Sequence, residues 1–165
     1  MAQLELHDLT VFYPGQETPA LRGVTASLEA GEFVTLCGRS GSGKSTLIQM
    51  LNGLLRPTSG HIYLDGTDIT SLSDRQLARI RNREIGFIFQ GYNLIQELDA
   101  LENVTLPLIY RGVPAWDRED LAMEALEKVG MAERAHHRPS EMSGGQQQRV
   151  AIARAIATRP PIIMA

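Results

Sequence analysis

The chain has 165 residues, a formal net charge of −3 and a charged fraction of 21%, which fit one ordinary soluble globular domain. This charge gives no reason to expect a nucleic-acid partner. No apolar run approaches the roughly 18 residues of a membrane span, and the N-terminus lacks the basic and apolar regions of a signal peptide. The single cysteine excludes an internal disulfide and fits a reducing compartment. We therefore expect a cytosolic protein, unless a partner holds it at a membrane.

The first part of the chain has the patterns of β-strands. Residues 3–13 and 21–29 read as strands that end in glycine-containing turns. The apolar run at residues 33–37 predicts another strand, in which Cys37 is expected to be buried. Residues 61–66 alternate again and predict a strand with a closing turn.

A glycine-rich segment, Gly-Arg-Ser-Gly-Ser-Gly-Lys-Ser-Thr, occupies residues 38–46, directly after the apolar run. Apolar side chains then recur at helical spacing over residues 47–55 and predict an amphipathic helix. Gly-x-x-x-x-Gly-Lys-Ser between a strand and a helix predicts a phosphate-binding loop, because backbone N–H groups and the helix N-terminus point at phosphate oxygens. A dinucleotide fold is disfavoured, because Thr46 stands where its third glycine would be. We predict a bound nucleoside triphosphate.

Two residues of this loop have specific predicted roles. Lys44 is expected to reach the terminal phosphates, and the Ser45 hydroxyl to ligate Mg²⁺. The other residues expected to contact the nucleotide are Gly38, Arg39, Ser40, Gly41, Ser42, Gly43 and Thr46. The alternative is a plain Gly/Ser turn, and the flanking strand and helix favour the phosphate interpretation.

A second helix is predicted after the strand at residues 61–66. Ser73-x-x-Gln76 is a capping box that predicts a helix continuing to about Asn82. Residues 85–89 are apolar and predict a strand that runs into Gln90.

Residues 91–140 lack strand patterns and predict an inserted helical subdomain. Asp99-x-x-Glu102 marks the start of one helix. A second helix is expected after Pro114, with Gly130 as its C-cap.

A further glycine-containing helix start, Ser143-Gly144-Gly145-Gln146, follows this region. Its hydroxyl, its two glycines and the helix N-terminus predict a second anion site. The alternative is an ordinary serine N-cap. The apolar run at residues 162–165 predicts a last strand.

A family resemblance rests on three segments that follow one another in the sequence: residues 38–46, Gln90 and residues 142–155. Over its whole length the chain resembles the ATP-binding-cassette ATPase domain of ABC transporters. Phrases at residues 85–90 and 101–108 are similar to the branch of lipoprotein-releasing and macrolide-export ATPases. The resemblance implies an α/β fold, with a RecA-like P-loop NTPase core, an N-terminal antiparallel β portion and an inserted helical subdomain.

The resemblance also implies a domain division. The nucleotide-binding core would comprise residues 1–90 and 141–165, and the helical subdomain residues 91–140. In the family, the acidic pair of the Walker B motif follows an apolar run such as the one ending at Ala165. We therefore expect a C-terminally truncated cassette that is inactive as an ATPase on its own.

Further site residues are implied by the resemblance alone. Tyr13 would stack on adenine, with packing of its own turn as the alternative. Gln90 matches the Q-loop glutamine, which touches Mg²⁺ or the attacking water. The resemblance thus implies Lys44 and Gln90 as catalytic residues and Ser45 and Gln90 as Mg²⁺ contacts. The signature residues Ser143–Gln146 would bind the γ-phosphate of ATP held by a second copy of the chain.

ATP and Mg²⁺ are the implied cofactors, and the implied partners are a second ATP-binding domain and membrane-spanning transporter subunits. The implied location is the cytoplasm, on the inner face of the cell membrane. The predicted function is to couple ATP binding and hydrolysis to export or lipoprotein release. Two alternatives remain open at this point: a soluble cassette ATPase outside transport, and a nucleotide-binding fragment that does not hydrolyse.

Overall fold

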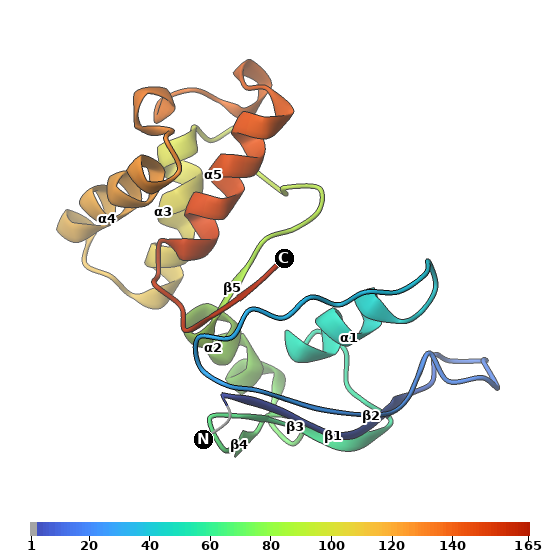
Figure 1. Cartoon of the computed structure of the whole chain (residues 1–165). Coiled ribbons are helices and arrows are strands. Elements are labelled where there is room, and N and C mark those ends of the chain that lie inside the picture. Colours follow the sequence, from blue (N-terminus) through green and yellow to red (C-terminus); the bar gives the residue numbers. More distant parts are fainter. Residues whose placement is uncertain (1–2) are drawn as a thin grey trace. The chain divides into compact units, whose positions relative to one another are not determined.

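The computed structural model describes residues 3–165 (Figure 1). The chain divides into two compact units, the first ending at Ala78 and the second beginning at Arg79. The earlier elements are β1 (Leu4–Val11), β2 (Leu21–Leu28), α1 (Lys44–Leu51), β3 (Ser59–Leu64), β4 (Thr67–Asp68) and α2 (Asp74–Glu84), which contains the boundary. The later elements are β5 (Ile85–Phe87), α3 (Ala100–Arg111), α4 (Ala115–Lys128), the 3₁₀ turns η1 (Ala132–Arg134) and η2 (Pro139–Glu141), α5 (Gly144–Ile156) and β6 (Ile162–Met164).

The first unit contains an antiparallel sheet with strand order β2-β1-β3-β4, as predicted for the N-terminal portion. Leu4 in β1 lies opposite Leu28 in β2 and Leu64 in β3. The alternation breaks at Asp8, which has a φ of 49°, and both pairings change register around it. Such a bulge returns the next apolar side chains to the core, so Leu9 is fully buried despite the shifted spacing.

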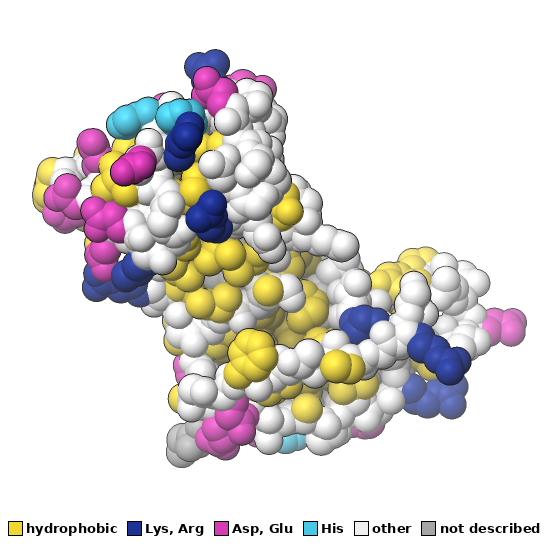
Figure 2. Space-filling model, turned by 45° about the horizontal axis from the view of Figure 1, so that its top comes forward, with side chains coloured by type: hydrophobic (Ala, Val, Ile, Leu, Met, Phe, Trp, Pro, Cys, Tyr) yellow, Lys and Arg dark blue, Asp and Glu magenta, His cyan; other side chains and the backbone are white. Residues whose placement is uncertain are grey.

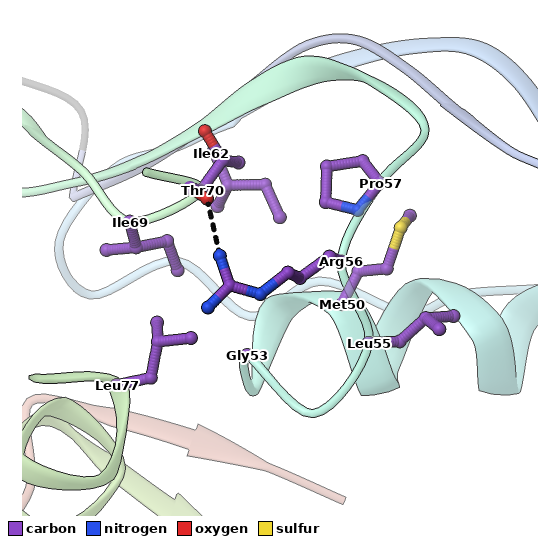
Figure 3. A pocket seen from close by; sticks show the side chains of 9 residues that line it. All are labelled: Met50, Gly53, Leu55, Arg56, Pro57, Ile62, Ile69, Thr70 and Leu77. Atoms are coloured by element: carbon purple, nitrogen blue, oxygen red, sulfur yellow. Dashed lines mark hydrogen bonds between the residues drawn. The ribbon is translucent and has the colours of Figure 1, made fainter. Parts of the chain in front are cut away.

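The end of α1 is joined to the segment before α2 by one arginine. The Arg56 guanidinium donates to the carbonyls of Thr70 (3.2 Å) and Leu72 (2.8 Å) and to Asp74 Oδ1 (2.9 Å). Figure 3 shows its side chain in a shallow hollow between α1, β3 and the start of α2. The side chains that line the hollow are Met50, Gly53, Leu55, Arg56, Pro57, Ile62, Ile69, Thr70 and Leu77. Because Arg56 already bonds to its walls, this hollow is a packing feature of the first unit.

Residues 32–40 form an irregular segment and not a strand. The prediction of a strand at residues 33–37 is therefore wrong. Figure 1 shows the stretch as a long coil that leads from β2 toward α1. Phe33 is 94% exposed and Val34 50% exposed, and Cys37 is exposed instead of buried. Neither sheet formed by residues 3–165 includes this stretch, and an apolar run without neighbouring strands has no ladder hydrogen bonds to hold it.

The second unit is built on α3, α4 and α5, which share one apolar core. Its most buried side chains include Val104, Leu108, Leu126 and Val150. The two helices predicted within residues 91–140 are confirmed as α3 and α4. The outer side of α4 is acidic, and Figure 2 shows Asp and Glu side chains gathered over the helical part. The exposed acidic residues of α4 are Asp117, Glu119, Asp120 and Glu127.

Two short parallel strands complete this unit. Ile85 in β5 lies opposite Ile162 in β6, and the N–H of Ile88 donates to the Met164 carbonyl (2.9 Å). The strands predicted at residues 85–89 and 162–165 thus form, although both are shorter than predicted. Gly86 allows α5 to approach, because a Cβ there would lie 2.4 Å from the Ala155 carbonyl oxygen.

Asn103 in α3 is fully buried (0% exposed) and organises the loop that precedes this helix. Its Oδ1 accepts from the N–H of Ile95 (2.8 Å). Its Nδ2 lies within donating distance of the carbonyls of Ile95 (3.1 Å), Leu98 (3.2 Å) and Asp99 (2.9 Å). Every polar atom of this side chain is therefore satisfied by the backbone of one loop.

Replacing Asn103 by leucine tests this role. The Asn103→Leu variant leaves the Ile95 N–H without its buried acceptor, so the free energy of unfolding should fall by about 2–4 kcal/mol. Urea denaturation followed by circular dichroism measures it. The control is Thr105→Ala, which removes one hydroxyl bond to the Leu101 carbonyl within the same helix (2.8 Å) and should cost less than about 1 kcal/mol. Equal losses for the two variants would contradict the assignment.

Candidate nucleotide-binding site

The loop at residues 38–46 leads directly into α1 through two glycines with left-handed backbone. Gly41 has a φ of 80° and Gly43, the N-cap of α1, a φ of 88°. Gly43 is needed for a second reason: an added Cβ would lie 2.7 Å from the Ala20 carbonyl oxygen and 2.6 Å from Leu21 Cδ2. The loop therefore packs its backbone against the start of β2, which only glycine permits.

The N-terminus of α1 is left open. No side chain caps it, and its backbone ladder begins with the Leu47 N–H donating to the Gly43 carbonyl (2.9 Å). The N–H groups of Lys44, Ser45 and Thr46 precede that bond, so they are the donors that a helix leaves unpaired. These donors and the helix dipole make a site for an anion.

Lys44 is folded back over its own loop. Its Nζ donates to the carbonyls of Gly38 (2.8 Å) and Arg39 (2.8 Å) and to Ser42 Oγ (3.3 Å). All three acceptors are neutral, whereas phosphate oxygens would form shorter and stronger charge-assisted bonds with the ammonium. The Lys44 ammonium thus lies within the loop, and phosphate oxygens could take the place of its present acceptors.

Tyr13 is joined to the same helix start. Its hydroxyl and that of Thr46 are hydrogen-bonded at 3.1 Å, and the ring is half-buried. The contact links the segment after β1 to the first turn of α1. Tyr13 and the predicted loop residues are therefore brought together in the first unit. Its stacking on a base stays a prediction.

Gln90 lies in the second unit, in a tight turn after β5. The N–H of Tyr92 donates to the Phe89 carbonyl (2.9 Å), and Gln90, which is exposed, is the second residue of this turn. Tyr92 and Asn93 have φ values of 61° and 48°, a left-handed conformation that costs an L-residue about 1–2 kcal/mol. Arg154 of α5 donates to the carbonyls of Tyr92 (2.6 Å) and Asn93 (2.7 Å).

Arg154 is a residue that the sequence motifs did not single out. Burial lowers the pKa of its guanidinium from the usual value, yet an arginine remains charged in proteins. Its two bonds to backbone carbonyls are therefore charge-assisted. Arg154 is separated from its two partners by 61 and 62 residues in the sequence. A local sequence motif therefore could not have predicted these bonds.

Ser143 is the N-cap of α5, also in the second unit. Its Oγ accepts from the Gln146 N–H (3.3 Å), and Gln146 Oε1 accepts from the Ser143 N–H (2.8 Å). The predicted helix start is therefore confirmed, and Ser143 caps it through a capping box. Gly144 and Gly145 have ordinary helical backbone, and no atom of residues 3–165 lies within 4 Å of a Cβ added to either. Packing among the described residues therefore does not require these glycines.

Ser45 and Gln90, the residues predicted to contact Mg²⁺, are both exposed. In the part of the chain that the structure describes, no group of three His, Cys, Asp or Glu side chains is placed to hold a metal ion. A metal at Ser45 would depend on phosphate oxygens for its other ligands, as in P-loop sites. No helix within residues 3–165 combines the length and apolarity that crossing a membrane requires.

The sequence matches the ABC transporter family over residues 21–165. The chain belongs to this family. An uncharacterised ABC transporter ATP-binding protein of Thermotoga maritima is 53% identical over 98% of this chain and 70% of its own. The lipoprotein-releasing system ATP-binding protein LolD of Alcanivorax borkumensis is 46% identical over 90% of this chain and 65% of its own. The macrolide export ATP-binding/permease protein MacB of Hyphomonas neptunium is 45% identical, and the chain spans 25% of its length.

Solved cassettes of the family share the fold. The ATP-binding cassette MJ0796, in a dimeric post-hydrolysis state bound to ADP and Pi, superposes with a TM-score of 0.89 at 44% identity. The match covers 97% of this chain and 72% of that one. The predicted fold class, an α/β P-loop NTPase of the ABC type, is confirmed.

The two left-handed glycines provide a matched pair of substitutions. Gly41→Ala introduces backbone strain alone, since nothing lies within 4 Å of its Cβ, and should cost about 1–2 kcal/mol of unfolding free energy. Gly43→Ala adds the clash with the Ala20 carbonyl, so we expect a loss of about 3 kcal/mol or more. Chemical denaturation of both variants measures the difference. Equal losses would show that the close approach to β2 is unimportant.

Proposed function

We propose that this chain is the ATP-binding part of an ABC transporter, in which ATP binding and hydrolysis drive transport by membrane-spanning partners. The observation that carries the proposal is the uncapped N-terminus of α1, which follows two left-handed glycines and has Lys44 in the same loop. Similarity to proteins named for lipoprotein release and macrolide export supports these transport classes over a soluble non-transport ATPase.

The loop would bind the β- and γ-phosphates through the N–H groups of residues 44–46. Lys44 would exchange the Gly38 and Arg39 carbonyls for phosphate oxygens and neutralise part of their charge. The exposed Ser45 hydroxyl would ligate Mg²⁺, which supplies a further positive charge to the phosphates. Gly38–Ser42 would line the phosphates with backbone and short polar side chains.

Tyr13 would stack on the adenine ring. Its bond to Thr46 limits how far the ring can move from the phosphate-binding turn, and a flat aromatic face suits any base. Stacking would thus orient the nucleotide along α1. The bond also gives Thr46 a part in binding, through the position of Tyr13.

Ser143 to Gln146 would contact the γ-phosphate of ATP held by a second copy. The two glycines leave the N-terminal surface of α5 open, and internal packing gives no reason for them. An anion approaching from another molecule would explain both features, because it needs close access to the first N–H groups of the helix. The dimeric cassette MJ0796, solved with ADP and Pi, supports this arrangement. The proposed assembly is therefore a homodimer with two shared sites.

Gln90 would position Mg²⁺ or the attacking water, since an amide can donate and accept without titrating. By the family resemblance, the carboxylate that polarises this water belongs directly after β6. Residues 91–140 would act as the helical subdomain, with residues 1–90 and 141–165 as the nucleotide-binding core. The docking surface for the membrane subunits would lie near Gln90 and residues 91–110, on the cytoplasmic face of the membrane.

Lys44→Ala tests the catalytic assignment in the full-length protein. Loss of a charge that stabilises the transferring phosphoryl group should reduce ATP turnover by roughly 100-fold or more. The melting temperature should change little, because Lys44 bonds only to its own loop. Steady-state phosphate release measures turnover. The control is Lys128→Ala at the sequence's other lysine, which pairs with Glu124 on α4. Wild-type turnover in Lys44→Ala would reject the proposal.

Mixing two inactive variants tests the shared sites. In a heterodimer of Lys44→Ala and Gly145→Asp chains, one site combines both defects and the other combines none. Random pairing should therefore restore about a quarter of wild-type turnover, because half the dimers contain one intact site. Each variant alone should stay inactive. If the mixture were no more active than each variant alone, the shared-site arrangement would be rejected. Ser143–Gln146 would then contact the nucleotide of their own chain, or no nucleotide.

A further inference from the structure

We infer that Arg154 is a positioning residue for Gln90, because its guanidinium holds the turn that carries Gln90 in one conformation. The inference rests on the proposed function, since it assumes that Gln90 acts in ATP hydrolysis. All the contacts that support it lie within the second unit.

Gln90 lies between two anchored points of the backbone. On its N-terminal side, the Ile88 N–H donates to the Met164 carbonyl and continues the pairing of β5 with β6. On its C-terminal side, the Tyr92 N–H closes the turn onto Phe89, and Arg154 bonds to the Tyr92 carbonyl. The orientation of Gln90 thus depends on where these two points are held.

The second anchor needs an external partner because its backbone is strained. Tyr92 and Asn93 both have left-handed φ values, and the Asn93 N–H donates to the Gly91 carbonyl only two residues away (2.7 Å). Such a conformation persists only where the surroundings over-determine it. The two successive carbonyls are bonded by one planar guanidinium, through Nη1 to Asn93 and Nη2 to Tyr92. Lysine cannot reproduce this fork.

Among residues 3–165, Arg154 is the one side chain that donates to the carbonyls of Tyr92 and Asn93. The side chain of Asn93 is short, and Gly91 would tolerate many conformations if the turn were released. Arg154 is partly buried and placed by α5, a helix whose Val150, Ala151 and Ala153 are fully buried in the core. The guanidinium is therefore fixed by a rigid element, as positioning requires.

The test compares Arg154→Gln with Arg154→Lys in the full-length protein. The kcat for ATP should fall about tenfold or more in Arg154→Gln and less in Arg154→Lys, with KM and nucleotide affinity within about twofold of wild type. The matched control is Arg118→Gln, which removes a comparable bond from Arg118 Nε to the Val113 carbonyl (2.7 Å) at the start of α4. This control should keep wild-type kcat.

A second substitution separates positioning from general destabilisation. Glycine adopts left-handed backbone without cost, so Asn93→Gly should recover about threefold or more of the kcat lost in Arg154→Gln. Hydrogen exchange of the peptide that spans residues 89–95 should rise in Arg154→Gln and fall again in the double variant. Wild-type kcat in Arg154→Gln, or a loss that Asn93→Gly does not relieve, would overturn the inference.

These results are distinguishable from failure of the proposed function. If the wild-type protein neither bound nor turned over ATP, the proposed function would fail, and the part that assigns Gln90 a role in hydrolysis would fail with it. Hydrogen exchange would still decide whether Arg154 holds the turn, because that measurement requires no nucleotide. Unchanged exchange in Arg154→Gln would overturn the inference even in an active ATPase.

Discussion

The candidate site depends on backbone donors in the first turn of α1 that no side chain satisfies. A helix start in water is normally capped, because unpaired N–H groups cost free energy when they are removed from solvent. Here the N-cap is Gly43, whose side chain has no acceptor, and its left-handed φ brings the loop against the carbonyl of Ala20. The same glycine thus leaves the first-turn donors open for the proposed phosphate and holds the loop against the start of β2. Lys44 adds a positive charge, whose ammonium donates to the carbonyls of the same loop.

The two glycine-containing helix starts differ in a way that suits different tasks. At α1 no N–H group of the first turn is used by a cap, so the whole turn is available to a polyphosphate. At α5 the Ser143 hydroxyl already accepts from Gln146, which leaves the N–H groups of Gly144 and Gly145 for a ligand. A partly capped helix start offers fewer donors and should bind an anion more weakly on its own. Weak binding at α5 would suit the proposed contact, in which α1 of a second copy supplies the nucleotide.

Local chemistry could be predicted from the sequence, and long-range pairing could not. Ser73 and Asp99 were found as helix starts because a capping box is complete within four residues. The P-loop was found for the same reason, since its glycines and its lysine all lie within residues 38–44. The strand at residues 33–37 was predicted wrongly, because apolar composition does not specify which strands will pair with it. The bulge at Asp8 was visible only as an imperfect alternation, and its register needed both neighbouring strands.

Arg154 illustrates the remaining limit of sequence reasoning. It follows the signature stretch on the same helix, where an arginine fits a solvated face as well as a buried contact. Its role depends on the left-handed backbone at Tyr92 and Asn93. Of these two residue types, only asparagine is common in that conformation. Neither the arginine nor the turn could be predicted from the sequence around the other, because the bonds join α5 to a turn about sixty residues earlier. A partly buried charged group that bonds two strained carbonyls stabilises a particular shape of that turn. Because Gln90 is part of the turn, the constraint applies to the residue for which we propose a role in hydrolysis.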